Sequence, residues 1–165
     1  MFTSESHSML WLYKYQYHFY MWQANIKDIN GKRQIFCDWR RKFVRLTPEE
    51  WVRQQVLHAL VDNTGYPAAR IAVEHPIQVG EVQKRCDAVV MGEQLQPLCI
   101  IEFKAEAVAL SQKVFDQVAV YNRRLQVPFF IISNGRTTYA CRVRENGYEF
   151  IEQLPTYEEL SSNES

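Results

Sequence analysis

Asp87, Glu102 and Lys104 are residue types used in metal-assisted hydrolysis of a phosphodiester, and each stands at the end of an apolar segment. Carboxylate oxygens bind Mg²⁺, which takes its remaining ligands from water and substrate phosphates. A lysine beside such a cation can orient the attacking water and stabilise the negative charge that develops on the phosphate. The alternative is a structural ion pair at the end of a strand, and spacing alone does not decide between the two.

The apolar segments predict an antiparallel hairpin. Residues 86–91 (CDAVVM) and 98–104 (LCIIEFK) have the composition of buried strands, and a short polar turn, 92–97, separates them. Successive side chains of a strand point to opposite faces, so Glu102 and Lys104 are expected to share one face.

Asp87 lies at the start of the first strand of this hairpin, and Glu102 and Lys104 lie at the end of the second. These are adjacent ends of an antiparallel pair, and alternation places Asp87 on the face of Val89 and Met91. We therefore expect Asp87, Glu102 and Lys104 to converge at one rim of the sheet. A register shift of a single residue would break this alignment.

A helix predicted over residues 105–125 follows the hairpin, and Val108 is among its expected apolar positions. Gln117 and Tyr121 are four residues apart and therefore share a face of it. Glutamine offers a donor and an acceptor, and tyrosine a hydroxyl. The alternative is the polar margin of a half-buried helix, so the pair gains weight only beside the carboxylates and the lysine.

The remaining elements complete an α/β pattern. Thr47 as N-cap, Pro48 and a capping-box Glu50 predict a helix that ends near Gly65. Further strands are predicted over 71–79 (bent at Pro76), 127–133, 137–143 and 148–154, and a turn at Asn30-Gly31 between two possible strands. Several strands are apolar on both faces, which predicts helices on both sides of the sheet.

Asp87, Glu102-Phe103-Lys104 and Gln117-x-x-x-Tyr121 together resemble the PD-(D/E)XK nuclease superfamily. The last element resembles its RecB-like branch and the nuclease domain of type I restriction enzyme R subunits. Segments such as LTPEEWVRQ, RCDAVV, IIEFKAEAV and FDQVAVYN resemble, in their order, small bacterial proteins grouped as type I restriction enzyme R-subunit N-terminal-like. The resemblance covers residues 25–157.

This resemblance implies a restriction-endonuclease-like core with a central mixed β-sheet flanked by helices. It implies that Asp87 and Glu102 are ligands of Mg²⁺, for which Mn²⁺ can substitute, and that Lys104 is the catalytic lysine. It assigns Gln117 and Tyr121 to the support of the site and to contact with DNA. Phe103 stands where a small residue is expected, and its side chain is expected on the opposite face.

Other titratable residues have simpler explanations. Glu49 or Glu50 could add a carboxylate from the first helix, but the capping box accounts for Glu50 and neither is included in the site. Glu74 is a comparable candidate, with a solvent-facing charge at a strand end as the alternative. His58 is expected at the edge of the core, and His75 in a turn before Pro76.

Composition limits the function classes. Net charge is zero, so any affinity for nucleic acid depends on a local basic patch. The best candidates for such a patch are Arg40, Arg41, Lys42, Arg123 and Arg124, although a solvated hairpin edge is the favoured explanation of the cluster over 40–45. Four scattered cysteines suggest reduced thiols and a cytoplasmic location, and no membrane segment or signal peptide is expected.

The chain is expected to divide into three parts. Residues 1–24 form an aromatic N-terminal extension of uncertain structure. Within it, aromatic and polar side chains alternate over 11–22, as they would in an edge strand or on a face that stacks on bases. Residues 25–157 form the nuclease-like domain, and 158–165 a polar, disordered tail. No helicase or ATPase motif occurs in the sequence, so no motor can be identified in it. Because a type I restriction R subunit needs such a motor, we do not expect this chain to be a whole restriction subunit.

The favoured function is Mg²⁺-dependent endonuclease hydrolysis of DNA, in restriction or repair, by a chain that could form a homodimer. The first alternative is a catalytically silent nuclease-fold module that binds nucleic acid or a partner protein. The second is a purely structural domain, in which the two carboxylates and Lys104 form an ordinary ion pair.

Overall fold

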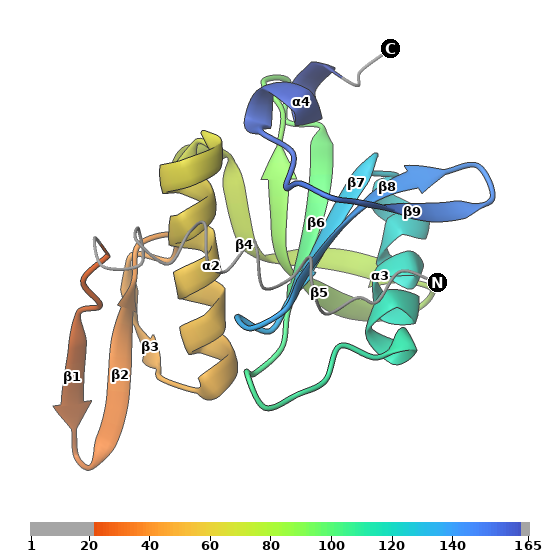
Figure 1. Cartoon of the computed structure of the whole chain (residues 1–165). Helices are drawn as coiled ribbons and strands as arrows, with labels where there is room; N and C mark the ends of the chain where they lie inside the picture. Colours follow the sequence, from red (N-terminus) through yellow and green to blue (C-terminus); the bar gives the residue numbers. More distant parts are fainter. Residues whose placement is uncertain (1–21, 163–165) are drawn as a thin grey trace.

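The computed structural model of the chain describes residues 22–162, which contain two separate sheets (Figure 1). The larger sheet consists of β4 (Ile71–Val79), β5 (Val82–Met91), β6 (Pro97–Phe103), β7 (Phe129–Ser133), β8 (Thr138–Arg144) and β9 (Gly147–Ile151), in that order across the sheet. β6 and β7 run parallel, and the other neighbours are antiparallel. The sheet is therefore mixed.

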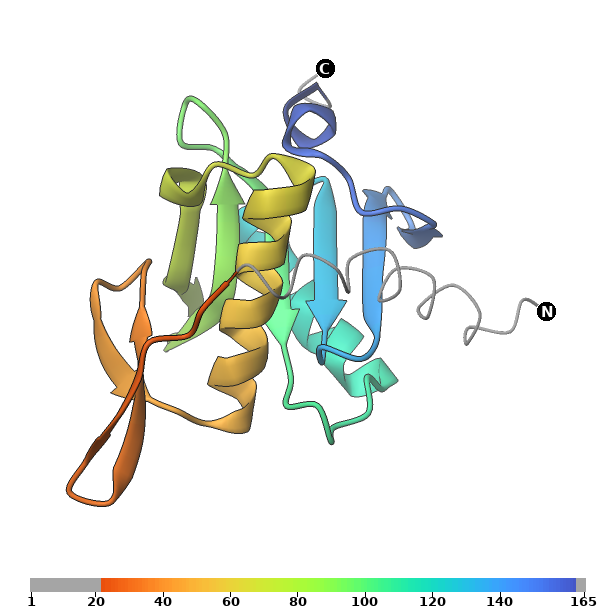
Figure 2. The ribbon, with the colours of Figure 1, turned by 60° about the vertical axis from the view of Figure 1, so that its left-hand side comes forward.

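Helices cover both faces of this sheet (Figures 1 and 2). α2 (Pro48–Thr64) and α4 (Tyr157–Ser162) pack on one face, and α3 (Gln112–Leu125) packs on the other. The predicted α/β architecture, a central mixed sheet flanked by helices, is confirmed. None of the helices within residues 22–162 has the length and apolar character needed to cross a membrane.

Two apolar cores separate the layers. The α2-side core includes Val56, Leu57, Leu60, Ile71, Ala88, Val90, Cys99, Ile101, Phe103 and Leu160. The α3-side core includes Ile77, Cys86, Val89, Ile100, Val114, Phe115, Val118, Tyr121, Phe130 and Ile132. The four cysteines are free and buried.

Local signals at the start of α2 act largely as predicted. Thr47 is the N-cap, and its hydroxyl accepts a hydrogen bond from the backbone N–H of Glu50 at 3.1 Å. Gly65 ends the helix in the left-handed region, at a φ of 72°. The expected capping box is only half formed, because the carboxylate of Glu50 bonds to Arg53 and Gln54 instead.

The smaller sheet precedes α2 and contains β1 (Ile26–Ile29), β2 (Lys32–Cys37) and β3 (Lys42–Arg45). The predicted turn at Asn30-Gly31 is confirmed, since both residues have the positive φ that a two-residue hairpin loop requires. The aromatic segment 11–22 lies outside the described residues, except for Trp22.

The hairpin of β4 and β5 bends sharply within its length. Ile71 and Val73 contact the α2-side core, whereas Ile77 and Val79 contact the α3-side core. All four positions are odd-numbered, so a regular strand would place them on one face. The irregular residue between the two pairs is Glu74, whose φ of 53° lies in the left-handed region.

β5 changes face at the matching position. Ala88 contacts the α2-side core and Cys86 the α3-side core, although two residues apart should share a face. β4 and β5 pair in the same register before and after the bend, so Glu74 lies opposite Asp87 at the bend itself. Strict alternation is therefore interrupted at Asp87, and the expectation that Asp87 shares the face of Val89 stays a prediction.

The bend lies earlier than predicted. Pro76 pairs with Arg85 within the ladder, and His75 pairs with Cys86, so neither the bend at Pro76 nor the turn at His75 is observed. Residues 75–86, which we call the β4–β5 arm, cross from the sheet toward α3 (Figure 1).

Two other segments differ from prediction. Residues 105–111 form a loop, and α3 begins only at Gln112. Val108 in this loop is 44% exposed, and its carbonyl accepts a hydrogen bond from the side-chain amide of Asn134 at 2.9 Å. The expected polar tail is helical from Tyr157 to Ser162, and Leu160 within it is fully buried.

Candidate active site

Glu102 occupies the centre of the candidate site, near the end of β6. Its side chain is almost fully buried, at 2% exposure for the residue. One oxygen, Oε1, accepts hydrogen bonds from Lys104 Nζ at 3.1 Å and from Gln117 Nε2 at 2.6 Å. The other oxygen, Oε2, is buried and has no hydrogen-bond partner among the described residues. Such an atom is rare in a folded protein and indicates a missing ligand or a functional role.

Burial and, next in size, the nearby charge of Asp87 together raise the pKa of Glu102 to about 7, against the opposing effect of Lys104. Burial would lower the pKa of Lys104, but the carboxylates of Glu102, Asp87 and Glu49 outweigh it and hold that pKa above its ordinary value. Lys104 is therefore a stable ammonium beside a surplus of negative charge.

Asp87 lies across the hairpin from Glu102, as predicted. Ala88 pairs with Ile101, and extension of this register places Asp87 opposite Glu102. The carboxylate of Asp87 accepts from Arg53 Nη2 at 3.0 Å and from the backbone N–H of Phe103 at 2.8 Å. Because β5 leaves the sheet at the bend, this carboxylate takes the place of a main-chain acceptor for Phe103.

Gln117 and Tyr121 face the site from α3, as the spacing predicted. Gln117 Nε2 donates to Glu102 and, at 3.1 Å, to the hydroxyl oxygen of Tyr121. The proton of that hydroxyl is therefore left for another acceptor. Burial raises the pKa of Tyr121, and Gln117 partly opposes this shift.

Glu49 is the residue that sequence reasoning weighed and set aside. It lies half-buried near the start of α2. Burial raises its pKa, Asp87 raises it further, and Lys104 opposes the shift, so its charge is felt within the site. The sequence signal for Glu49 was its place in the first turn of α2. A carboxylate is also favourable there in any helix, because it complements the helix dipole.

Glu50 and Glu74 belong to a buried ionic network rather than to the site itself. The carboxylate of Glu50 bonds to Arg40, to Arg53 at 2.7 Å and to Gln54 at 2.8 Å. Glu74 lies 3.5 Å from Arg40 and 3.9 Å from Arg53. Arg53 thus links both acidic residues to Asp87.

His58 and Phe103 have structural positions. His58 stacks on Trp22 and lies edge-on to Trp39, and burial lowers its pKa despite the nearby Asp38. Phe103 is buried in the α2-side core, on the face opposite Glu102, as expected.

A divalent cation fits the donors of this site. Oε2 of Glu102 is a buried carboxylate oxygen to which no described residue donates a hydrogen bond, and each Asp87 oxygen retains a lone pair beyond the hydrogen bond it accepts. Within the described residues, however, no three Asp, Glu, His or Cys side chains meet in a metal-binding arrangement. Water and substrate would therefore supply most of the ligands, as is usual for Mg²⁺.

Comparison with known proteins places the chain in a family. Residues 48–155 match the sequence profile of the type I restriction enzyme R protein N terminus (HSDR_N), whereas no curated protein matches. A fragment assigned as the HsdR subunit of a type I restriction enzyme from Vibrio vulnificus YJ016 shares the fold, with a TM-score of 0.53 and 18% identity. The likeness covers 70% of this chain and 24% of that one.

A second solved structure, of a protein assigned as a DUF820 nuclease from Anabaena variabilis ATCC 29413, has a TM-score of 0.47 and 11% identity over 82% of this chain and 87% of that one. The family expected from the sequence motifs is confirmed by the profile match, which spans most of the larger sheet and both α2 and α3. The chain belongs to the family of the type I restriction enzyme R protein N terminus.

Proposed function

We propose that this chain is a Mg²⁺-dependent nuclease domain that hydrolyses phosphodiester bonds of DNA, in restriction or repair. One observation carries the proposal: the buried carboxylate of Glu102 accepts hydrogen bonds from Lys104 and Gln117 through one oxygen, and its other oxygen has no hydrogen-bond partner within residues 22–162. Membership of the restriction R-protein family supports DNA as the substrate and assembly with other subunits. The four free cysteines suit a cytoplasmic location.

Each residue has a role in this proposal. Glu102 and Asp87 hold Mg²⁺ or Mn²⁺, which when bound lowers the pKa of a water and offsets charge on the phosphate. Lys104 keeps its proton and donates hydrogen bonds to the attacking water or to a phosphate oxygen. Gln117 fixes the rotamer of Glu102, and Tyr121 positions Gln117 and offers its hydroxyl proton to the DNA backbone.

The test is cleavage of DNA with Mg²⁺ or Mn²⁺, using plasmid, linear duplex and single-stranded substrates. Lys104→Ala should lower cleavage by about 10²–10³-fold, the effect of removing one donor that stabilises transition-state charge. Lys113→Ala, which removes an exposed lysine from α3, should cleave as wild type does. Circular dichroism of both variants checks that the fold is retained.

A second function is favoured by the hydrogen bonds of Asp87. Both of its oxygens are engaged, by Arg53 and by the Phe103 backbone, as they would be in a structural role. A nuclease-fold module without turnover, which binds nucleic acid or a partner protein, would have this geometry. If wild-type protein cleaves no DNA form with either cation, this second function replaces the first.

A further inference from the structure

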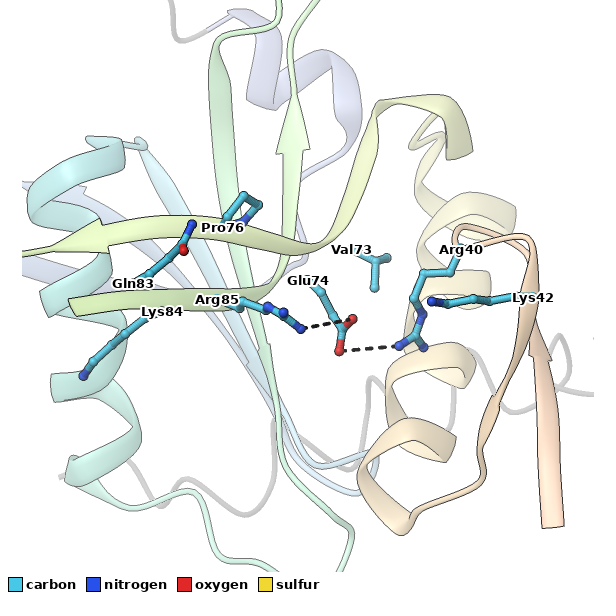
Figure 3. Close-up of a pocket in the computed structure, with 8 residues that line it drawn as sticks. All are labelled: Arg40, Lys42, Val73, Glu74, Pro76, Gln83, Lys84 and Arg85. Carbon is cyan, nitrogen blue, oxygen red and sulfur yellow. Dashed lines mark ion pairs between the residues drawn. The ribbon is translucent and has the colours of Figure 1, made fainter. Parts of the chain in front are cut away.

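A pocket of about 490 Å³ opens beside the bend of the β4–β5 hairpin (Figure 3). One wall comes from the start of β3 and the turn before it, and the other from the bend of β4 and the adjoining β4–β5 arm. The lining residues are Arg40, Lys42, Val73, Glu74, Pro76, Gln83, Lys84 and Arg85. The sequence separates these two walls by some thirty residues, so the pocket could be found only from the fold.

The pocket is strongly basic in a chain whose net charge is zero. Its lining has four cationic side chains and one carboxylate, that of Glu74, which gives a formal charge of +3. Arg40 is fixed by its bonds to Glu50 and Glu74. Among the described residues Lys42 and Lys84 form no ion pair, and Arg85 reaches Glu74 only at 4.0 Å. Most of this positive charge therefore remains available to an anion.

The shape of the lining indicates which part of a nucleic acid it suits. Among residues 22–162 no aromatic side chain lines the pocket, so this part of the chain offers no surface there on which a base could stack. Lys42 extends toward Arg40, Arg85 reaches toward Glu74, and Lys84 lies farther along the arm (Figure 3). Several cations from two elements suit the phosphates of a polynucleotide backbone, which such side chains bind without regard to sequence.

The pocket adjoins the candidate active site through the bend. Glu74 in the pocket is opposite Asp87 in the strand ladder. Arg53 lies 3.9 Å from Glu74 and 3.0 Å from Asp87, so a single buried guanidinium joins the two. A strand held in the pocket would therefore run directly past the site.

We infer that this pocket binds backbone phosphates of the DNA that the site acts on. The inference rests on the proposed function for its choice of DNA, and it assigns the DNA path to Lys42, Lys84 and Arg85. Of the five basic residues singled out in the sequence, Arg40 and Lys42 line this pocket. Arg123 and Arg124 lie instead in the last turn of α3.

The test is DNA affinity in EDTA, where binding is measured without turnover. Full-length wild type and the triple variant Lys42→Gln/Lys84→Gln/Arg85→Gln are titrated onto fluorescein-labelled duplex and single-stranded oligonucleotides over a range of salt concentrations. The triple variant should bind at least about tenfold more weakly at low salt, and its salt dependence should fall by about three units of slope. All three residues are exposed, so the fold should be retained.

The matched control is Lys113→Gln/Arg123→Gln/Arg124→Gln, which removes the same charge from exposed positions on α3. It should bind as wild type does. Equal loss in both triple variants, or wild-type affinity in the pocket variant, overturns the inference. So does absence of any DNA affinity in wild type at low salt, which would point to an acidic protein partner.

The outcome is separable from that of the proposed function. Binding in EDTA is measured without metal-dependent turnover, so the pocket is tested whether or not the site cleaves. Binding that depends on the pocket, with no cleavage by wild type, would sustain this inference and overturn the nuclease. If wild type cleaves DNA but the pocket variant binds DNA as tightly as wild type does, the nuclease is sustained and this inference is overturned.

Discussion

At the scale of single residues, Glu102 has the least favourable environment in the site. Its carboxylate is buried and faces the charges of Asp87 and Glu49, and in the described part of the chain Lys104 is the only cation within hydrogen-bond distance of it. Burying a charge that is incompletely paired is costly. A cation at Oε2 would offset that cost. The cost should therefore appear as lower stability of the metal-free protein when Glu102 is charged.

We expect Glu102→Gln to remove a pH dependence of stability in EDTA. The pKa of Glu102 is about 7 in the folded protein, above its ordinary value of 4.5. Between these two values the folded state retains a proton that the unfolded state has released, so stability falls as pH rises through this range. Relative to the glutamine variant, wild type should therefore lose stability from about pH 5 to about pH 8.

Urea denaturation of both proteins at the two pH values measures this difference. Parallel pH profiles would contradict the environment described for Glu102. Addition of Mg²⁺ at the higher pH should then stabilise wild type and leave Glu102→Gln unchanged, because a ligand that binds only the folded state stabilises it.

At the scale of elements, the buried guanidinium of Arg53 joins α2 to the sheet. It bonds to Glu50 within the helix and to Asp87 on β5, and it is only 6% exposed. Removing it would take from Asp87 its ion-pair partner and leave Arg40 as the cation paired with Glu50. The contact therefore fixes α2 against the strand that supplies Asp87 to the site.

Arg53→Ala should lower the free energy of unfolding by about 3–5 kcal/mol, the range for breaking one partner of a buried ion pair. Chemical denaturation followed by circular dichroism measures the loss. Arg45→Ala, which removes an exposed arginine from β3, should change stability by less than about 0.5 kcal/mol. Similar stability of the two variants would show that Arg53 is not a buried link.

The elements that were predictable are those specified by local sequence. Thr47 and Gly65 delimit α2 because cap and C-cap geometry act within a few residues. The alignment of Asp87 with Glu102 was predictable because a short turn leaves the hairpin few registers. The contact between Gln117 and Tyr121 on α3 was predictable from helical periodicity, which places residues four apart on one face.

The features that were missed depend on tertiary contacts. The loop at Val108 is held by Asn134, a residue distant in sequence, which prevents an earlier start of α3. The reversal of faces at Glu74 has no local marker, since the proline two residues later was the stronger signal. The basic pocket needed that bend, because only the bend brings the arm beside Lys42.

At the scale of the whole molecule, α4 closes the α2-side core after the chain has passed through every strand. Leu160 is fully buried in that core. Two tyrosine hydroxyls hold the segment in place: Tyr66 donates to the carbonyl of Pro155 at 2.8 Å, and Tyr157 to that of Met91 at 3.1 Å. The polar sequence around Leu160 resembles a tail, but its single large apolar side chain completes the core.

Leu160→Ala should therefore lower the free energy of unfolding by about 2–5 kcal/mol, the range for removing a buried leucine side chain and leaving a cavity. Glu158→Ala, an exposed position in the same short helix, is the control and should change stability by less than about 0.5 kcal/mol. Denaturant unfolding of the two variants compares these losses directly. If residues 158–162 were a detached tail, both substitutions would leave the unfolding midpoint where wild type has it. A selective loss at Leu160 would instead show that the domain extends beyond residue 157 and that α4 stabilises the sheet carrying Glu102 and Lys104.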